Sequence, residues 1–284
     1  IEEQIEARLR EDWDRPTGDA VGRIVSDDTA DSEYVAHLLS SISVPLDPIT
    51  VVVDGANGAA SLVGPVTYRE AGADVIEIHC RPDGYNINDG CGSTHMEDLQ
   101  RAVLEHGADL GIAHDGDADR CLAVDARGQL VDGDQLMAII ALSLRDQARL
   151  VKDTVVATVM ANLGFKQAMQ REGIEVVETA VGDRYVLEAM LESGYILGGE
   201  QSGHVVMTEH ATTGDGILTA LQVMSRMAAT GKSLAELASV MDRLPQVLVN
   251  VAGVDKNAVD SNAAVAQAVA AAESRLGDSG RVLL

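Results

Sequence analysis

Residues 49–58 read Ile-Thr-Val-Val-Val-Asp-Gly-Ala-Asn-Gly, and this stretch decides the fold. The apolar run 49–53 predicts a buried strand, and the glycines of 54–58 predict a turn directly after it. A helical pattern follows to Ala71, and a second strand is expected over 75–79. Strand, turn, helix and strand form a βαβ unit, which predicts a parallel sheet. The turn is not a dinucleotide-binding fingerprint, because the third glycine is absent.

The same order of elements recurs in the second half of the chain. Strands are predicted over 154–160, 174–179, 195–197 and 205–207, and helices over 163–171, 182–192 and 213–229. We therefore predict an α/β fold: two tandem related α/β domains with mixed, mostly parallel sheets, plus partial flanking domains.

The expected domain boundaries follow from these two units. Residues 1–31 are interpreted as the tail of a first domain and a linker, and 32–147 and 148–243 as the two complete units. Residues 244–284 are expected to start a further, incomplete domain with a strand at 247–251, a helix at 263–276 and a strand from 282. A last strand without a successor leads us to expect truncation at both ends.

Composition narrows the functional classes. The net charge is -24, from 45 acidic and 21 basic residues, so the chain should repel nucleic acid and anionic membranes. The apolar run 136–144 is too short to span a bilayer. Three cysteines form no Cys-x-x-Cys pair and cannot all pair internally, which indicates a reducing compartment and a cytoplasmic location.

Residues 114–121 read His-Asp-Gly-Asp-Ala-Asp-Arg-Cys and carry the strongest chemical signal. Asp115, Asp117 and Asp119 place three carboxylates within five positions, where they repel one another unless a cation neutralises them. Hard divalent cations such as Mg²⁺ prefer such oxygen ligands. Gly116 is expected to supply positive φ to the turn. Arg120 adds a fixed cation, and metal plus arginine suits a phosphoryl group.

Other interpretations of this segment are weaker. An acidic solvated turn is the plain alternative, because Asp-Gly pairs are common in turns. An EF-hand would need glycine and an acidic residue where Arg120 and Ala126 stand. Ala118-Asp119 fits an aspartate-nucleophile phosphatase poorly.

A second candidate site follows the strand predicted at 195–197. Glu200 and Ser202 alternate, so in an extended loop they would share a face and could bind vicinal sugar hydroxyls. His204 can act as an acid or base near neutrality, although a structural histidine is the commoner role. Gly182, Asp183 and Arg184 open a helix and could bind an anion, or form an ordinary N-cap.

Together these motifs resemble the α-D-phosphohexomutase superfamily, and within it the bacterial phosphoglucosamine mutases. The resemblance rests on five motifs in order. They are 86–88 with 91–95, 115–120, 181–186, 199–204 and 213–217. Gln201 and the Gly-Asp-Arg segment favour this branch over the phosphomannomutase/phosphoglucomutase branch.

The resemblance implies an intramolecular phosphotransferase that interconverts glucosamine 6-phosphate and glucosamine 1-phosphate through a bisphosphate. Unit 32–147 would bind Mg²⁺ through Asp115, Asp117 and Asp119, and unit 148–243 would bind the hexosamine phosphate. Residues 244–284 would begin a phosphate-binding domain. Arg120 and His204 would be catalytic. The substrate would contact Glu200, Ser202, Gly182, Asp183 and Arg184.

The family's donor phosphoserine motif does not occur in this sequence, so we expect no activity from this chain alone. A homodimer is compatible with the resemblance, but the sequence does not determine the oligomeric state. The alternatives are a mutase for mannose or glucose phosphates, and a noncatalytic module that binds sugar phosphate. His114 stands where the family pattern leads us to expect an apolar residue, and the sequence gives it no role.

Overall fold

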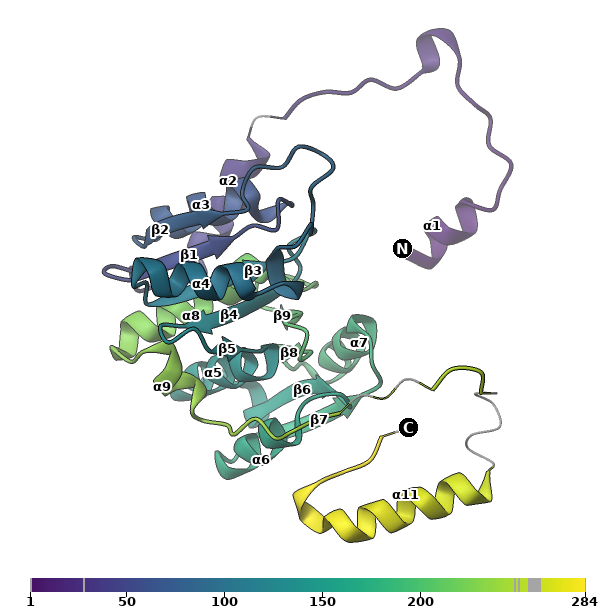
Figure 1. Cartoon of the computed structure of the whole chain (residues 1–284). Helices are drawn as coiled ribbons and strands as arrows, with labels where there is room; N and C mark the ends of the chain where they lie inside the picture. Colours follow the sequence, from purple (N-terminus) through teal and green to yellow (C-terminus); the bar gives the residue numbers. More distant parts are fainter. Residues whose placement is uncertain (1, 28, 248, 250, 255–261, 284) are drawn as a thin grey trace.

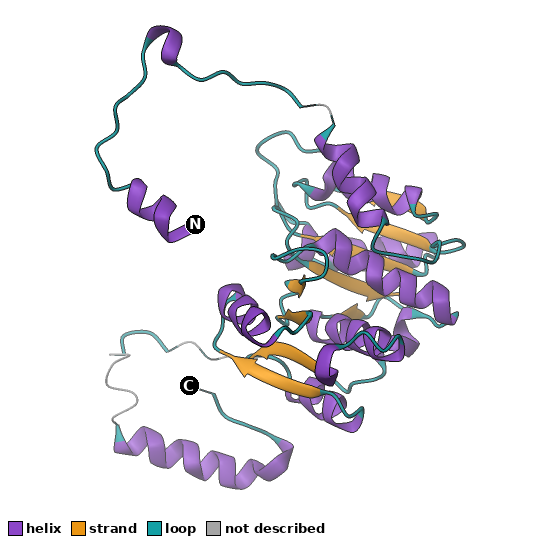
Figure 2. Ribbon diagram, turned by 180° about the vertical axis from the view of Figure 1, so that it is seen from behind, coloured by secondary structure: helices purple, strands orange, loops and turns teal. Residues whose placement is uncertain are grey.

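The computed structural model describes residues 2–27, 29–247, 249, 251–254 and 262–283. Two β-sheets with flanking helices lie one after the other along the body of the molecule (Figure 1). Seen from behind, the strands of both sheets run between helices (Figure 2). The predicted fold class, two related α/β units with mixed and mostly parallel sheets, is confirmed.

The first sheet has the strand order β2-β1-β3-β4-β5. Its strands are β1 (Thr50–Asp54), β2 (Asp74–Ile78), β3 (Leu110–His114), β4 (Cys121–Asp125) and β5 (Leu130–Val131). Strands β2, β1 and β3 are parallel, whereas β4 and β5 add antiparallel strands. The βαβ unit predicted from residues 49–79 is therefore present, with α3 (Ala60–Glu70) as its crossover helix.

The second sheet repeats this arrangement in the order β7-β6-β8-β9. Its strands are β6 (Thr154–Thr158), β7 (Glu175–Thr179), β8 (Leu197–Gly199) and β9 (Val205–Met207). Strands β7, β6 and β8 are parallel, and β9 returns antiparallel to β8. The β8–β9 hairpin thus occupies the position that the β3–β4 hairpin has in the first sheet.

Alternating apolar residues explain why both sheets are covered on two faces. Val51 and Val53 of β1 face a core shared with α3, whereas Val52 packs with residues of α4 (Glu97–His106). The second sheet follows the same rule. Val156 packs with α7 (Asp183–Ser193), and its neighbours in β6 pack with α6 (Leu163–Arg171). A strand buried on both faces is typical of parallel α/β sheets.

Two helices join the units. Helix α5 (Gly133–Asp146) contacts β4 of the first sheet as well as β8 and α6 of the second. Helix α8 (Gly216–Thr230) follows β9 in the chain, yet it packs on β3, β4 and α3 of the first unit. One hydrophobic cluster therefore runs through both units. The order of helices and strands in the sequence did not predict that α5 and α8 would each pack against the other unit.

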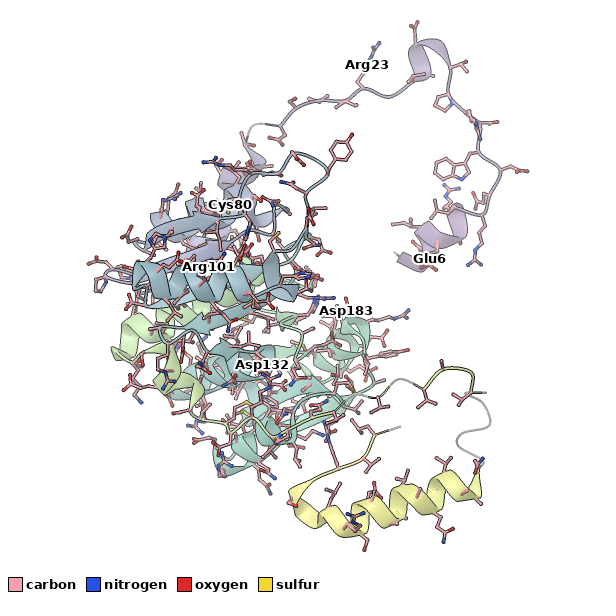
Figure 3. The ribbon with its side chains drawn as sticks, viewed as in Figure 1. Glu6, Arg23, Cys80, Arg101, Asp132 and Asp183 are labelled. Atoms are coloured by element: carbon pink, nitrogen blue, oxygen red, sulfur yellow. The ribbon has the colours of Figure 1, made fainter. Side chains whose placement is uncertain are left out.

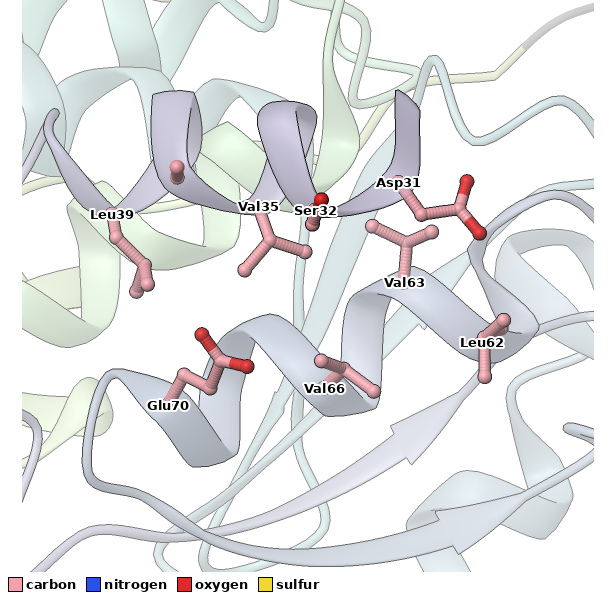
Figure 4. Close-up of a pocket in the computed structure, with 9 residues that line it drawn as sticks. Asp31, Ser32, Val35, Leu39, Leu62, Val63, Val66 and Glu70 are labelled. Atoms are coloured by element: carbon pink, nitrogen blue, oxygen red, sulfur yellow. The ribbon is translucent and has the colours of Figure 1, made fainter. Parts of the chain in front are cut away.

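Helix α2 (Ala30–Leu39) lies over α3 and leaves a groove between them (Figure 4). Apolar side chains line it and two carboxylates stand at its ends. The lining residues include Val35, Leu39, Leu62, Val63 and Val66, with Asp31 and Glu70.

The N-terminal segment lies apart from this body (Figure 1). The C-terminal segment returns to it, because the Arg281 guanidinium donates to the Ala161 carbonyl. Helix α1 (Glu2–Arg8) is followed by exposed residues up to 27, and α11 (Ala263–Leu276) matches the predicted helix. The strand expected at 247–251 falls partly outside the described residues, and its described residues form no strand. Residues 282 and 283 are also not in a strand, and residue 284 lies outside the described chain.

No helix in the described part of the chain combines the length and the apolar character needed to cross a membrane.

Candidate active site

The β3–β4 hairpin brings the three predicted metal ligands together. One carboxylate oxygen from each of Asp115, Asp117 and Asp119 lies within 4.8 Å of the other two. Asp115 is buried, Asp119 is partly buried and Asp117 is exposed. The three carboxylates therefore form a cup that is open to solvent on one side.

The turn is built differently from the sequence expectation. Gly116 does not adopt positive φ; Ala118 does, at φ +63°, and its N–H donates to the Asp115 carbonyl at 3.2 Å. Glycine is needed at 116 for space, because a Cβ there would lie 2.7 Å from the Ile87 and Asn88 side chains. The loop that contains these two side chains therefore closes directly over the turn.

Arg120 balances part of the negative charge. The Arg120 Nε lies 3.5 Å from Asp115 Oδ2 and 3.6 Å from Asp119 Oδ1. The backbone N–H of Arg120 donates to Asp115 Oδ1. Burial, and next the nearby Asp119 carboxylate, raises the pKa of Asp115 to about 6. Among the described residues, Asp119 Oδ1 is buried without a hydrogen-bond partner. Crowded, under-satisfied carboxylate oxygens fit a hard divalent cation.

His114, to which the sequence gave no role, is a buried residue that contacts the backbone of this turn. It is fully buried, and its Nδ1 lies 3.1 Å from the Arg120 carbonyl. Because a carbonyl only accepts, Nδ1 carries the proton, and Nε2 accepts from the Tyr68 hydroxyl at 2.9 Å. Burial lowers the pKa of His114, which favours this neutral form.

The predicted sugar loop is a tight turn between β8 and β9, whereas the shared face of Glu200 and Ser202 was inferred for the case of an extended loop. The Glu200 N–H donates to the His204 carbonyl at 2.9 Å, and the Gly203 N–H donates to the Glu200 carbonyl at 3.0 Å. The turn still brings the two polar side chains together. Ser202 Oγ lies 3.5 Å from Glu200 Oε2, so a carboxylate and a hydroxyl are presented side by side.

The segment 182–184 lies against this turn. The Gly182 N–H donates to Glu200 Oε1 at 3.1 Å, and Gly182 is the N-cap of α7 with φ +132°. Asp183 accepts the Arg184 N–H at 2.7 Å at the start of that helix (Figure 3). Arg184 Nε contacts Glu188 Oε1 at 2.8 Å, one helical turn further on. The two motifs predicted separately thus form one surface.

The β3–β4 and β8–β9 hairpins are in direct contact. The Cys121 N–H donates to the Gly203 carbonyl at 3.0 Å, and Arg120 pairs with His204 in an antiparallel bridge. His204 is buried; its Nε2 accepts the Gly214 N–H at 3.1 Å. Its Nδ1 therefore carries the proton toward Asp119 Oδ2, 3.0 Å away. A residue of the sugar turn thus holds a predicted metal ligand.

Asp132 is a member of this network that the sequence analysis missed. Its Oδ2 accepts the Gln201 side-chain amide at 3.4 Å and lies 3.3 Å from Arg243 Nε. Its Oδ1 accepts the Gln135 N–H in a capping box at the start of α5. The Asp-Gly-Asp-Gln string at 132–135 was the available signal, because glutamine three residues after an N-cap marks a capping box.

A cavity of about 350 Å³ opens beside the β3–β4 hairpin. Asp117 and Ala118 line one side, and Tyr34 and Asp215 line another. The Tyr34 hydroxyl donates to Asp215 Oδ2 at 2.8 Å, which joins α2 to the segment before α8. The candidate site therefore draws residues from both units.

Comparison with known proteins identifies the family. The phosphoglucomutase/phosphomannomutase alpha/beta/alpha domain II matches residues 32–128, and domain III of the same family matches residues 132–244. The chain belongs to this family. The resemblance deduced from the sequence motifs is thus confirmed.

Curated relatives within this family share most of the sequence. Phosphoglucosamine mutase of Streptomyces griseus subsp. griseus is 60% identical over the whole chain, and that of Nocardioides sp. is 62% identical. The chain spans 64% and 63% of the length of these relatives. A solved structure of Aspergillus fumigatus N-acetylphosphoglucosamine mutase, in complex with GlcNAc-6P and magnesium, has a TM-score of 0.56 at 22% identity. The match covers 75% of this chain and 52% of that one, and it shows a shared fold.

Proposed function

We propose that this chain carries the metal and sugar sites of a phosphoglucosamine mutase, which interconverts glucosamine 6-phosphate and glucosamine 1-phosphate. The observation that carries the proposal is the contact between the two hairpins, in which His204 of the sugar turn holds Asp119 of the metal turn. A phosphate near the carboxylate cup and a sugar on the Glu200 turn would therefore belong to one ligand. Relatives at about 60% identity that are named phosphoglucosamine mutase support the substrate.

Asp115, Asp117 and Asp119 would hold Mg²⁺. The family likeness to a structure that contains magnesium, and the under-satisfied Asp119 oxygen, support this ion. Bound there, Mg²⁺ would neutralise charge on the phosphoryl group that is transferred. Arg120, which is 42% exposed along its side chain, can turn from the carboxylates toward a phosphate oxygen.

Glu200 and Ser202 would orient the sugar ring. One Glu200 oxygen is fixed by the Gly182 N–H, and the other is shared with the exposed Ser202 hydroxyl. A carboxylate suits a substrate with an ammonium group at C2, because a charge-assisted hydrogen bond is stronger than a neutral one. Gly182, Asp183 and Arg184 would complete this side of the site.

His204 would position Asp119 and would not exchange protons with the substrate. Both of its ring nitrogens are engaged, with Asp119 and with the Gly214 amide, and the side chain is only 5% exposed. The catalytic role predicted from the sequence would therefore reduce to fixing a metal ligand. We further propose a cytoplasmic location and a phosphoryl donor outside these residues.

The experiment compares kcat/KM for glucosamine, mannose and glucose 6-phosphates in the complete gene product that contains this chain. We expect a preference for the amino sugar of roughly ten- to a hundred-fold, worth about 1–3 kcal/mol. Comparable kcat/KM values for glucosamine 6-phosphate and mannose 6-phosphate would refute the assignment of glucosamine phosphate as the substrate. Binding of all three without turnover would indicate the noncatalytic module.

The 284-residue chain alone should show no mutase turnover, because no donor serine motif is present in it. The control is Asp117→Asn purified in the same way. If the unaltered chain shows turnover and Asp117→Asn does not, a phosphoryl donor outside this chain is not needed.

A further inference from the structure

A second cluster of metal-ligating side chains lies in the first unit, outside the carboxylate cup. Asp54 ends β1, His79 follows β2, and Cys91 precedes the short 3₁₀ turn Gly92–Thr94. A carboxylate oxygen, a ring nitrogen and the Cys91 sulfur all lie within 4.8 Å of one another. Asp54 and Cys91 are buried, whereas the His79 side chain is 26% exposed and gives access from solvent.

We propose that Asp54, His79 and Cys91 form a binding site for Zn²⁺. Thiolate, imidazole and carboxylate are the ligands that zinc takes in proteins, whereas Mg²⁺ takes oxygen ligands only. Three protein ligands leave a fourth position for water. The ligand set thus separates this site chemically from the aspartates of the β3–β4 hairpin.

The distances suit an ion of this size. Asp54 Oδ2 lies 2.9 Å from His79 Nδ1, so the two atoms now share a proton. Zinc lies about 2.0–2.2 Å from nitrogen and oxygen ligands and about 2.3 Å from sulfur, so a small opening of this pair would admit it. Zinc at His79 Nδ1 would move the ring proton to Nε2, beside Asp98, and the Cys91 thiol would release its proton to solvent.

The surroundings of the three ligands resemble the outer shell of a metal site. His79 Nε2 lies 3.4 Å from Asp98 Oδ2, and a metal-bound histidine usually donates its second N–H to a carboxylate. The Asn57 side-chain amide donates to Cys91 Sγ at 3.8 Å. Burial, and next the Asp54 carboxylate, raises the pKa of the Cys91 thiol, so a bound cation would have to displace its proton. Asp54 is fixed by the Gly92 N–H at 3.0 Å.

The backbone around the cluster is held in an uncommon conformation. Ala56, Asn57 and His79 are not glycines, yet they have φ of +53°, +47° and +48°. Gly92 packs so closely that a Cβ there would lie 2.6 Å from the Ala56 Cβ. Non-glycine residues in this conformation gather at active sites and ligand clamps, where the surrounding structure fixes the geometry in advance.

The test titrates the chelator-treated chain with Co²⁺, a spectroscopic substitute for Zn²⁺. We expect one equivalent to produce a thiolate-to-cobalt charge-transfer band and tetrahedral visible bands, both removed by Zn²⁺. Cys91→Ser should abolish the charge-transfer band. Cys80→Ser is the matched control. Cys80, labelled in Figure 3, follows His79 in the chain, but its sulfur contacts the Ile78 carbonyl at 3.2 Å.

A stability measurement guards against a folding defect in the serine variant. Zn²⁺ should raise Tm of the wild-type chain and of Cys80→Ser, but not of Cys91→Ser. His79→Asn is a second ligand variant, because asparagine tolerates the left-handed backbone at this position, and it should weaken Co²⁺ binding by tenfold or more.

Asp117→Asn should leave the cobalt spectrum unchanged, so failure of the proposed magnesium site and failure of this site are distinguishable. The proposal is overturned if Co²⁺ binds only without a charge-transfer band. It is also overturned if the band persists in Cys91→Ser or disappears in Cys80→Ser.

Discussion

The β3–β4 and β8–β9 hairpins occupy the same position in their sheets but carry different chemistry. Each starts with a strand parallel to the central strand and returns antiparallel. The turn of the first holds three carboxylates and an arginine, whereas the turn of the second holds one carboxylate, a hydroxyl and glycine. The scaffold therefore determines where a site forms, and the turn residues determine what it binds.

The two hairpins also differ in what stabilises them. The acidic turn needs a buried histidine, an arginine and, by our proposal, a cation to offset its charge. The sugar turn is closed by its own backbone hydrogen bonds. Substitutions should therefore affect the first through metal binding and the second through packing and ligand contacts.

The largest effect is expected from Asp117→Asn. This change removes a charged ligand that nothing else in the described cluster replaces, so Mg²⁺ binding should fall below detection by calorimetry. The control is Glu200→Gln, which changes the sugar turn and should bind Mg²⁺ as the wild type does. Equal binding heats for Asp117→Asn and the wild type would exclude the aspartate cup as the metal site.

The contact between the hairpins is tested by Gly203→Ala. A Cβ at Gly203 would lie 2.3 Å from the Cys121 carbonyl oxygen, at φ +94°. Left-handed strain and overpacking together should cost about 2–5 kcal/mol of unfolding free energy. Gly194→Ala has φ +72° and no neighbour within 4 Å of the new Cβ, so it should cost only about 1–2 kcal/mol.

Denaturant unfolding of both glycine variants measures the difference in their unfolding free energies. This difference reports how much the packing of one hairpin on the other contributes to stability. Magnesium affinity should also fall in Gly203→Ala, because His204 follows directly and holds Asp119. Equal stabilities of the two variants would show that the hairpin contact is loose.

The sequence predicted most of the scaffold, because its signals are local. Apolar runs such as 51–53, and the helix at 163–171, depend on residues close together in the chain. The packing of α8 on the first sheet could not be predicted, because nothing in its own pattern says which sheet it covers. Long-range packing of this kind depends on the assembled surfaces.

The clustering of the three carboxylates was predicted better than the geometry of the turn that carries them. Five positions can present three carboxylates to one cation whatever the turn, so the cup was predictable. The sequence could not predict that Ala118, and not Gly116, adopts positive φ. Glycine is required at 116 by the side chains of Asn88 and Ile87, which come from a distant loop. The partners of His114 come from Tyr68 and a backbone carbonyl, which no spacing rule reveals.

The sugar turn is tested more directly by Glu200→Ala in the complete gene product. Loss of a charge-assisted hydrogen bond costs about 1.5–3 kcal/mol, so kcat/KM should fall by roughly 10- to 150-fold. Mg²⁺ affinity should stay as in the wild type, because within the described chain the Glu200 carboxylate bonds to Gly182 and Ser202 and to none of the three aspartates proposed to hold the ion. An unchanged kcat/KM would leave the turn with a structural role only.

The smallest effect is expected from Ser202→Ala. A neutral hydroxyl hydrogen bond contributes about 0.5–1.5 kcal/mol, so kcat/KM should fall by roughly 2- to 12-fold. Ser202 Oγ lies 3.5 Å from Glu200 Oε2, so the two side chains should act on the same part of the sugar. The double variant should then lose less than the product of the single losses. Strictly multiplicative losses in this double-mutant cycle would mean that the two groups contact the ligand independently, and the shared surface inferred for the sugar turn would be wrong.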